Sequence, residues 1–297
     1  MRLICILLVL LLLGGLIPSV VLYALAAEIP TKVELKTGVS INSNSNAAID
    51  YSNLAEGFVS VKYTGGKDVK IKVQVVKTGG TTYTYNLNNK GNYETFPLVE
   101  GDGKYTIKVF ENTTGTKYAQ DLSYTAELKL RNEFLPFLYS NQYVNYTADS
   151  KVVAKAAELV KGKTTDLDKL SAVYNFVIKN FTYDTNRAKT VTSGYLPVVD
   201  SVLAEKKGIC FDYAAVMSAM LRSQNIPCKL VVGYAGTIYH AWINVYLAGQ
   251  GWIEKAIYFD GKNWTLMDPT FASSAKSSPE IMRYISNGSN YTQKYAY

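Results

Sequence analysis

Residues 210–223 most constrain the fold, because their pattern predicts a helix that packs closely against a sheet. Small and apolar side chains form one compact helical face, as a buried central helix needs: Ala214, Ala215, Met217, Ser218 and Leu221. A turn at 224–227 follows. Strands are then predicted at 228–234, 240–246, 252–253, 256–259 and 264–268. This order predicts one helix packed on an antiparallel sheet.

Residues from about 28 to 130 carry a different pattern, with apolar and polar residues alternating. A period of two places one face of a strand in a core and the other in water. The clearest runs are 59–63, 69–75, 105–109 and 122–128, and Gly- and Asn-rich turn signals separate them. About seven short strands at this spacing predict an immunoglobulin-like or fibronectin-like β-sandwich, which acts as a spacer or binding module.

Between these two parts, residues 131–149 include Pro136 and several tyrosines and predict a linker. From residue 150 the apolar spacing becomes helical, which predicts a helix to about residue 160 and a second that begins at Thr165. Asp200 is placed to cap a short helix over 201–205. The predicted fold class is therefore α+β, with an all-β sandwich over 28–130 and a second domain over 150–297.

The N-terminus predicts export. Arg2 is the only charged residue before Glu28, and the apolar run between them ends in Ala24-Leu25-Ala26, which is typical of a signal-peptide cleavage site. The run is also long enough to serve as an uncleaved membrane anchor. Either alternative places the rest of the chain outside the cytoplasm, secreted or on the extracellular face of the membrane or cell wall. The membrane is expected as a partner only through an uncleaved N-terminal segment.

Charge narrows the range of partners. The formal net charge is +7, which favours anionic surroundings such as wall polymers. The sequence has no run of five or more Lys or Arg residues and no nucleic-acid reader motif, so nucleic acid is not expected as a partner.

Three residues have the chemistry of an activated thiol. Cys210 begins the central helix, where the positive end of the dipole favours a thiolate and backbone N–H groups can hold an oxyanion. His240 is the only histidine of the chain and begins a strand, whereas Asp268 ends another. We expect His240 to exchange the proton and Asp268 to orient the imidazole. Cys210 would then attack an amide carbonyl, and water or a primary amine would resolve the thioester.

Each of these residues also has a simpler interpretation. Cys210 and Cys228 can form a disulfide in an exported protein, although the helix between them spans about 20 Å, which the following strand must retrace before the two sulfurs meet. Cys228 is otherwise a small buried filler. Asp212 and Arg222 can form a local ion pair on the helix. Trp242 is expected in the core or the cleft wall.

The motifs around these residues resemble one family. Gly208-Ile209-Cys210, Asp212-Tyr213-Ala214, Ile226-Pro227, Gly233-Tyr234, His240-Ala241-Trp242 and Asp268-Pro269-Thr270 resemble the transglutaminase-like superfamily of papain-like thiol enzymes over about residues 134–275. The resemblance implies a papain-like core with Cys210 as nucleophile, His240 as base and Asp268 as orienting acid. It also implies an oxyanion-stabilising side chain upstream of Cys210, for which Tyr195 is the candidate.

The function expected from this resemblance is an exported cysteine-dependent acyl-transfer enzyme that acts on protein or peptide amides by hydrolysis or cross-linking. The sequence has no evident acidic cluster that would bind calcium, so control by calcium is not expected. No cofactor or metal is expected either. An alternative is a catalytically idle scaffold or cell-surface adhesin whose β-sandwich binds a partner. A weaker alternative is an amidase that acts on cell-wall peptides, which the basic charge would suit.

Overall fold

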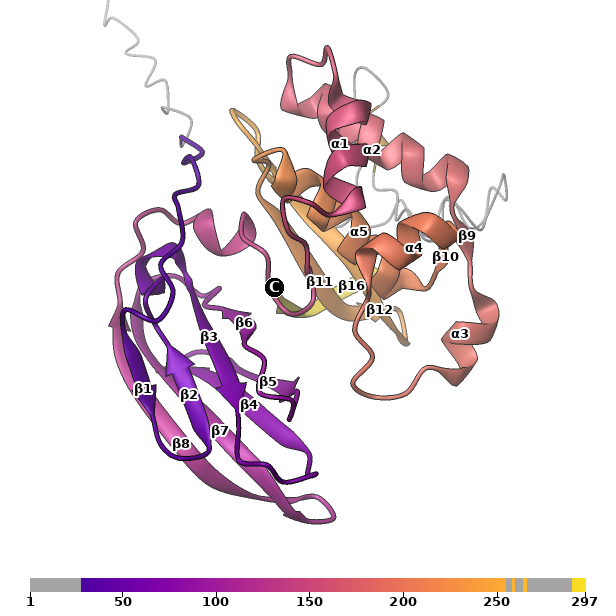
Figure 1. The fold of residues 1–297 in the computed structure, drawn as a ribbon. Helices are drawn as coiled ribbons and strands as arrows, with labels where there is room; N and C mark the ends of the chain where they lie inside the picture. The colour runs from indigo at the N-terminus through magenta and orange to yellow at the C-terminus, as the bar shows by residue number, and fades with distance from the viewer. Residues whose placement is uncertain (1–27, 255–257, 260–263, 266–289) are drawn as a thin grey trace, which may run out of the picture.

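The computed structural model describes residues 28–254, 258–259, 264–265 and 290–297. It has two lobes (Figure 1): the N-terminal strands form one, and the helices with the remaining strands form the other. The expected mixture of a β-rich N-terminal part and a later helix-and-sheet core is confirmed.

The first lobe consists of two four-stranded antiparallel sheets, which we call the N-terminal sheets. Their strand orders are β1-β2-β3-β6 and β5-β4-β7-β8. The alternation of apolar and polar residues in the sequence explains why these segments form strands. In β4, for example, Ile71, Val73 and Val75 are buried, whereas Lys72 and Gln74 are half-buried. The strand bounds are β1 Ile41–Ser43, β2 Ala47–Asp50, β3 Phe58–Tyr63, β4 Ile71–Lys77, β5 Thr82–Leu87, β6 Glu94–Pro97, β7 Gly103–Thr114 and β8 Lys117–Leu128.

The second lobe contains five α-helices among residues 150–224. Both predicted helix starts are confirmed; at the second, the Thr165 hydroxyl accepts a hydrogen bond from the Asp168 N–H at 3.1 Å, as an N-cap does. The helices are α1 Lys151–Val160, α2 Asp166–Asn180, α3 Thr185–Thr190, α4 Val199–Glu205 and α5 Cys210–Ser223. Two short strands, β9 Thr182–Tyr183 and β10 Lys207–Gly208, pair in parallel just before α5.

Asp200 does not have the predicted role of capping the short helix α4. Its carboxylate accepts the backbone N–H groups of Lys151 and Val152, each at 3.0 Å. Asp200 therefore caps α1, because it lies inside the first turn of α4 and its side chain reaches the free N–H groups of a neighbouring helix.

The predicted pairing of α5 with an antiparallel sheet is confirmed. Every residue from Asp212 to Arg222 is buried. The sheet has the order β13-β12-β11-β16, with bounds β11 Cys228–Ala235, β12 Ile238–Leu247, β13 Gly251–Ile253 and β16 Tyr291–Ala296; β14 Tyr258–Phe259 and β15 Trp264–Thr265 form a separate pair. Gly233 is required here, because a Cβ at this position would lie 2.1 Å from the main-chain oxygen of Thr292 in β16.

Arg222 joins several parts of the core, although no ion pair accompanies it among the described residues. The guanidinium is fully buried and donates to the main-chain oxygens of Cys228 at 2.9 Å, Tyr139 at 2.8 Å and Tyr297 at 2.6 Å. Burial lowers the pKa of Arg222. The three acceptors belong to β11, the segment before α1 and the residue after β16, so this one side chain links elements far apart in sequence.

The predicted linker, residues 131–149, packs against both lobes. It includes a short 3₁₀ helix, Leu135–Phe137. The Phe134 ring lies 4.2 Å from the Tyr246 ring of β12, and Tyr139 lies 5.4 Å from Phe58 of β3, measured between ring centroids. The two lobes are therefore joined through a shared apolar contact.

Tyrosines complete the contact between the lobes. Tyr83 and Tyr85 of β5 lie 5.5 and 5.8 Å from Tyr297, and Tyr85 lies 5.5 Å from Tyr143, between ring centroids. The end of the chain accordingly lies between the two lobes in Figure 1.

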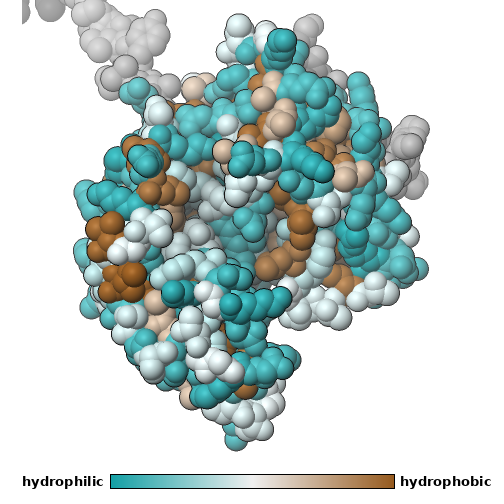
Figure 2. All heavy atoms as spheres, in the orientation of Figure 1, coloured by the Kyte–Doolittle hydropathy of each residue, from teal (hydrophilic) through white to brown (hydrophobic). Residues whose placement is uncertain are grey.

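The face seen in Figure 2 is mostly hydrophilic, with hydrophobic side chains in a few separate patches. Exposed apolar side chains include Val39 and Ile41 at the start of the N-terminal sheets, and Val198 before α4. Within the described residues, no helix combines the length and the hydrophobicity that a membrane crossing needs.

Candidate active site

Cys210 is the first residue of α5 and is half-buried. Two residues later, the fully buried Asp212 carboxylate turns back and accepts the Ile209 N–H at 2.8 Å. An acidic side chain at the third helical position that binds the N-cap backbone is one half of a capping box. Asp212 therefore fixes the turn that presents the Cys210 thiol.

Gly208 makes this turn possible. A Cβ at Gly208 would lie 2.6 Å from the Asp212 Cβ and 2.9 Å from its Oδ2. Any larger residue would displace the carboxylate. The Gly208 carbonyl also accepts the Asp184 N–H at 2.8 Å, which ties the start of α5 to β9.

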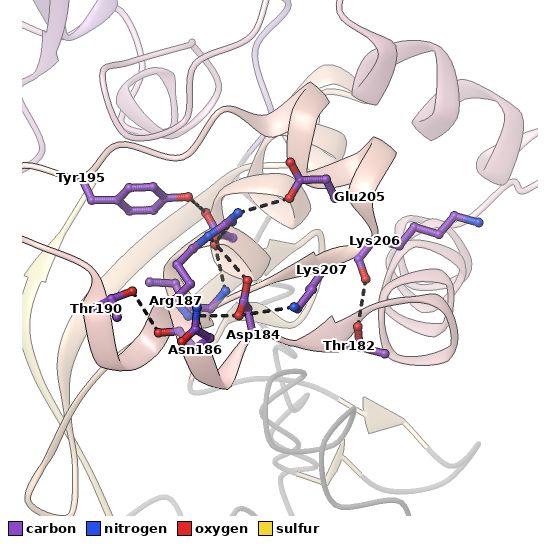
Figure 3. Close-up of polar contacts among 11 residues, drawn as sticks. Thr182, Asp184, Asn186, Arg187, Thr190, Tyr195, Glu205, Lys206 and Lys207 are labelled. Carbon is purple, nitrogen blue, oxygen red and sulfur yellow. Dashed lines mark hydrogen bonds and ion pairs between the residues drawn. The ribbon is translucent and has the colours of Figure 1, made fainter.

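The expected ion pair between Asp212 and Arg222 is wrong. Ten residues of helix separate the two side chains by about 15 Å along the axis. Asp212 instead binds Arg187 of α3, whose Nη1 lies 3.3 Å from Oδ2. Arg187 also contacts Glu205 at 3.2 Å and Asp184 at 3.7 Å, and Figure 3 shows this cluster around the guanidinium. The buried carboxylate is thus paired, as burial of a charge requires.

Tyr195 also binds Asp212, because its hydroxyl donates to Oδ1 at 2.6 Å. Its ring points toward the Arg187 cluster in Figure 3. Burial, and next the hydrogen bond to Asp212, raises the pKa of Tyr195, so the phenol keeps its proton. A phenol has a single O–H donor, and here Asp212 receives it. The structure therefore places Tyr195 in the cavity wall and attaches the loop before α4 to the start of α5.

His240 lies near the start of β12 and is 4% exposed. Its ring stacks on Trp242 with 6.4 Å between centroids and 24° between planes, and lies 6.4 Å from the Tyr291 ring. Trp242 belongs to a small apolar cluster with Val231, Ala235, Tyr291 and Ala296. Ala241 points to the other face of β12 and packs in the core that contains α5. Trp242 and Tyr291 thus hold the imidazole from the side.

A cavity of about 580 Å³ brings the candidate residues together, within the range of small-ligand sites. Cys210, Tyr195 and His240 all line it, whereas Trp242 is placed behind His240 in the apolar cluster. Asp268 lies outside the described residues, so its predicted role stays a prediction.

Both described cysteines, Cys210 and Cys228, are free thiols, so the alternative of a disulfide between them is wrong. Cys228 is fully buried, and its sulfur lies 3.3 Å from the Ser218 hydroxyl. Burial raises the pKa of the Cys228 thiol to about 11. Cys228 is therefore the small buried filler that the sequence predicts.

Two contributions to this site were not predicted from the sequence. The first is the capping role of Asp212, which its position three residues after Ile209 could have indicated. The walls contributed by Lys72, Thr84 and Asn86 of the N-terminal sheets had no local signal, because they arise from how the two lobes pack.

Similarity to known proteins agrees with the motifs. The model of the Transglutaminase-like superfamily matches residues 153–269. The Uncharacterized protein YebA of Bacillus subtilis is 27% identical over 191 residues, which cover 57% of this chain and 26% of that protein. The human Kyphoscoliosis peptidase is 26% identical over 148 residues, which cover 46% of this chain and 20% of that protein.

The chain thus spans about a quarter or less of the length of these two relatives. Among solved structures, red sea bream transglutaminase aligns with a TM-score of 0.27 and 13% identity, over 72% of this chain and 48% of its own. The match of the family model includes Cys210, His240 and Asp268. Residues 153–269 of this chain therefore form a domain of the transglutaminase-like superfamily.

Proposed function

We propose that this chain is an exported, cysteine-dependent acyl-transfer enzyme that acts on protein or peptide amides. The observation that carries the proposal is the shared cavity: within a transglutaminase-like domain, Cys210 at a helix start and the only histidine line the same space. Export rests on the apolar N-terminal run that ends in Ala24-Leu25-Ala26. The N-terminal sheets are proposed to be an immunoglobulin-like or fibronectin-like sandwich over 28–130, linked to the second domain by residues 131–149.

The proposed reaction has two halves. In the first, His240 takes the Cys210 proton, the thiolate attacks the amide carbonyl, and the C–N bond breaks as the imidazolium gives its proton to the leaving amine. The acyl group is then held on sulfur as a thioester. In the second half, water or a primary amine attacks the thioester and releases an acid or a new amide, which restores the thiol. Asp268 is proposed to orient the imidazole and to stabilise its charged form.

The test uses p-nitrophenyl acetate, an activated acyl donor that needs no specific recognition. We expect the full chain to release p-nitrophenolate in a burst of about one equivalent and to carry an acetyl group on the Cys210 peptide by mass spectrometry. Cys210→Ala should abolish both signals, whereas Cys228→Ala should keep them because Cys228 is buried. Absence of the thioester in the unmodified chain would overturn the proposal and leave the idle scaffold as the better interpretation.

A second experiment distinguishes transfer of the acyl group from the thioester to an amine from hydrolysis of the thioester by water. A fluorescent primary amine added to a glutamine-containing protein is incorporated if the acceptor is an amine. Release of a shorter peptide or of ammonia without incorporation indicates that the acceptor is water.

A further inference from the structure

The N-terminal sheets form one wall of the cavity that holds Cys210 and His240. Lys72 of β4 and Thr84 and Asn86 of β5 line it. These side chains lie on the outer face of their sheet, since the alternate residues Ile71 and Val73 point into the apolar core between the sheets.

Asn86 fixes this wall against the second lobe. Its main-chain oxygen accepts the Gln142 side-chain amide at 2.5 Å. Across the cavity, a Cβ on Gly194 would lie 2.8 Å from the Asn86 amide nitrogen, and Gly194 has a positive φ of 94°. The sheets and the loop before α4 thus approach each other closely at a glycine, so the wall has a defined position relative to Cys210.

The wall carries a basic side chain. Lys72 is the only Lys, Arg, Asp or Glu among the described residues that line the cavity. Its ammonium donates to the Asn86 side-chain oxygen and makes no ion pair among the described residues. An ammonium has three donors, so donors remain for a ligand.

We infer that Lys72, held by Asn86, forms an anion subsite that selects acyl donors carrying a carboxylate close to the amide attacked by Cys210. The inference rests on the proposed function and deepens it, because it names acidic peptides as the substrate class. Recognition is by charge: Lys72 is half-buried, and a carboxylate that faces an ammonium near a protein surface is attracted more strongly than in bulk water. A neutral peptide of the same shape would forgo this attraction and leave the Lys72 ammonium without an anionic partner.

The first test compares two thiol reagents that differ in charge. Iodoacetate is an anion and iodoacetamide is neutral, and each alkylates Cys210, as read from the mass of its peptide in the full chain. We expect Lys72→Gln to lower the ratio of the iodoacetate rate to the iodoacetamide rate by about threefold or more. Lys72→Arg should preserve the ratio and Lys72→Glu should lower it further.

The matched control is Lys104→Gln. Lys104 is exposed, does not line the cavity and lies at the opposite end of β4 from Lys72, where Lys77 pairs with Tyr105. The strand rise of about 3.3 Å per residue places it more than a Debye length from Lys72. Lys104→Gln removes the same net charge, so the rate ratio should stay within about 1.5-fold of that of the unmodified chain. Equal ratios in Lys72→Gln and Lys104→Gln would overturn the inference.

This test is independent of the proposed function. An ordinary thiol also reacts with both reagents, more slowly, so the ratio is measurable whether or not His240 activates Cys210. The proposed function fails if p-nitrophenyl acetate forms no thioester on Cys210. The inference about Lys72 fails if the ratio of the iodoacetate rate to the iodoacetamide rate is unchanged in Lys72→Gln.

The substrate class is tested by binding to the Cys210→Ala chain, in which no reaction can occur. The probes are acetyl-glutamyl-glycinamide and acetyl-glutaminyl-glycinamide, titrated by NMR. We expect the glutamyl peptide to bind at least about threefold more tightly, and Lys72→Gln to remove the preference. Equal binding of the two peptides would exclude acidic peptides as the preferred class.

Discussion

Replacing His240 by alanine is expected to slow acylation of Cys210 by p-nitrophenyl acetate about 10³-fold, which is typical for loss of a general base. The physical reason is that a neutral thiol is a poor nucleophile, and no other histidine exists in the chain to take its proton. The rate of p-nitrophenolate release in the burst measures the effect.

A control separates catalysis from folding in this variant. His240 is buried beside Trp242 and Tyr291, so its loss also leaves a small cavity. Added imidazole can replace the missing base and should restore part of the rate, whereas a purely structural defect would not respond to it. A variant that acylates at the normal rate would show that His240 does not take the proton.

Replacing Arg222 by methionine is expected to lower the free energy of unfolding by about 2–5 kcal/mol, because buried main-chain oxygens lose a charged donor and each buried unsatisfied group costs about 1–3 kcal/mol. The substitution removes the Arg222 donor from the main-chain oxygens of Cys228 and Tyr139. It also removes one of the two donors of the Tyr297 main-chain oxygen, which keeps the Leu230 N–H at 2.9 Å. Urea unfolding followed by circular dichroism measures the change.

Lys179→Met is the matched control for Arg222→Met, because it removes a positive charge from an exposed position near the end of α2. It should change the free energy of unfolding by no more than about 0.5 kcal/mol. Arg222→Lys keeps the charge but loses the planar fork of donors, so we expect an intermediate loss. If Arg222→Met is as stable as Lys179→Met, the three hydrogen bonds do not contribute as described.

Much of the fold could be predicted from local patterns. The alternation of apolar and polar residues at 69–75 predicted the strand β4, and the helical spacing of apolar residues after Thr165 predicted the helix α2. Both predictions succeed because each pattern depends only on which face of one element is buried. The small-residue face of the central helix likewise predicted that α5 lies against a sheet.

What the sequence could not supply was the partner of each polar side chain. Asp200 caps α1 instead of its own helix, and Asp212 pairs with Arg187 instead of Arg222. Local spacing limits which residues can meet within one element, but contacts between elements depend on tertiary packing. For the same reason the cavity wall around Lys72 could not be foreseen from strand patterns.

Cys210 is proposed to act as the nucleophile, with His240 taking its proton. The most direct measurement is the rate of Cys210 alkylation by iodoacetamide at pH 7, read on the Cys210 peptide of the full chain and of its His240→Ala variant. We expect His240→Ala to lower this rate about tenfold or more, because a neutral thiol is a poor nucleophile and no other histidine of the chain can take the proton. Equal rates in the two proteins would show that His240 does not activate Cys210.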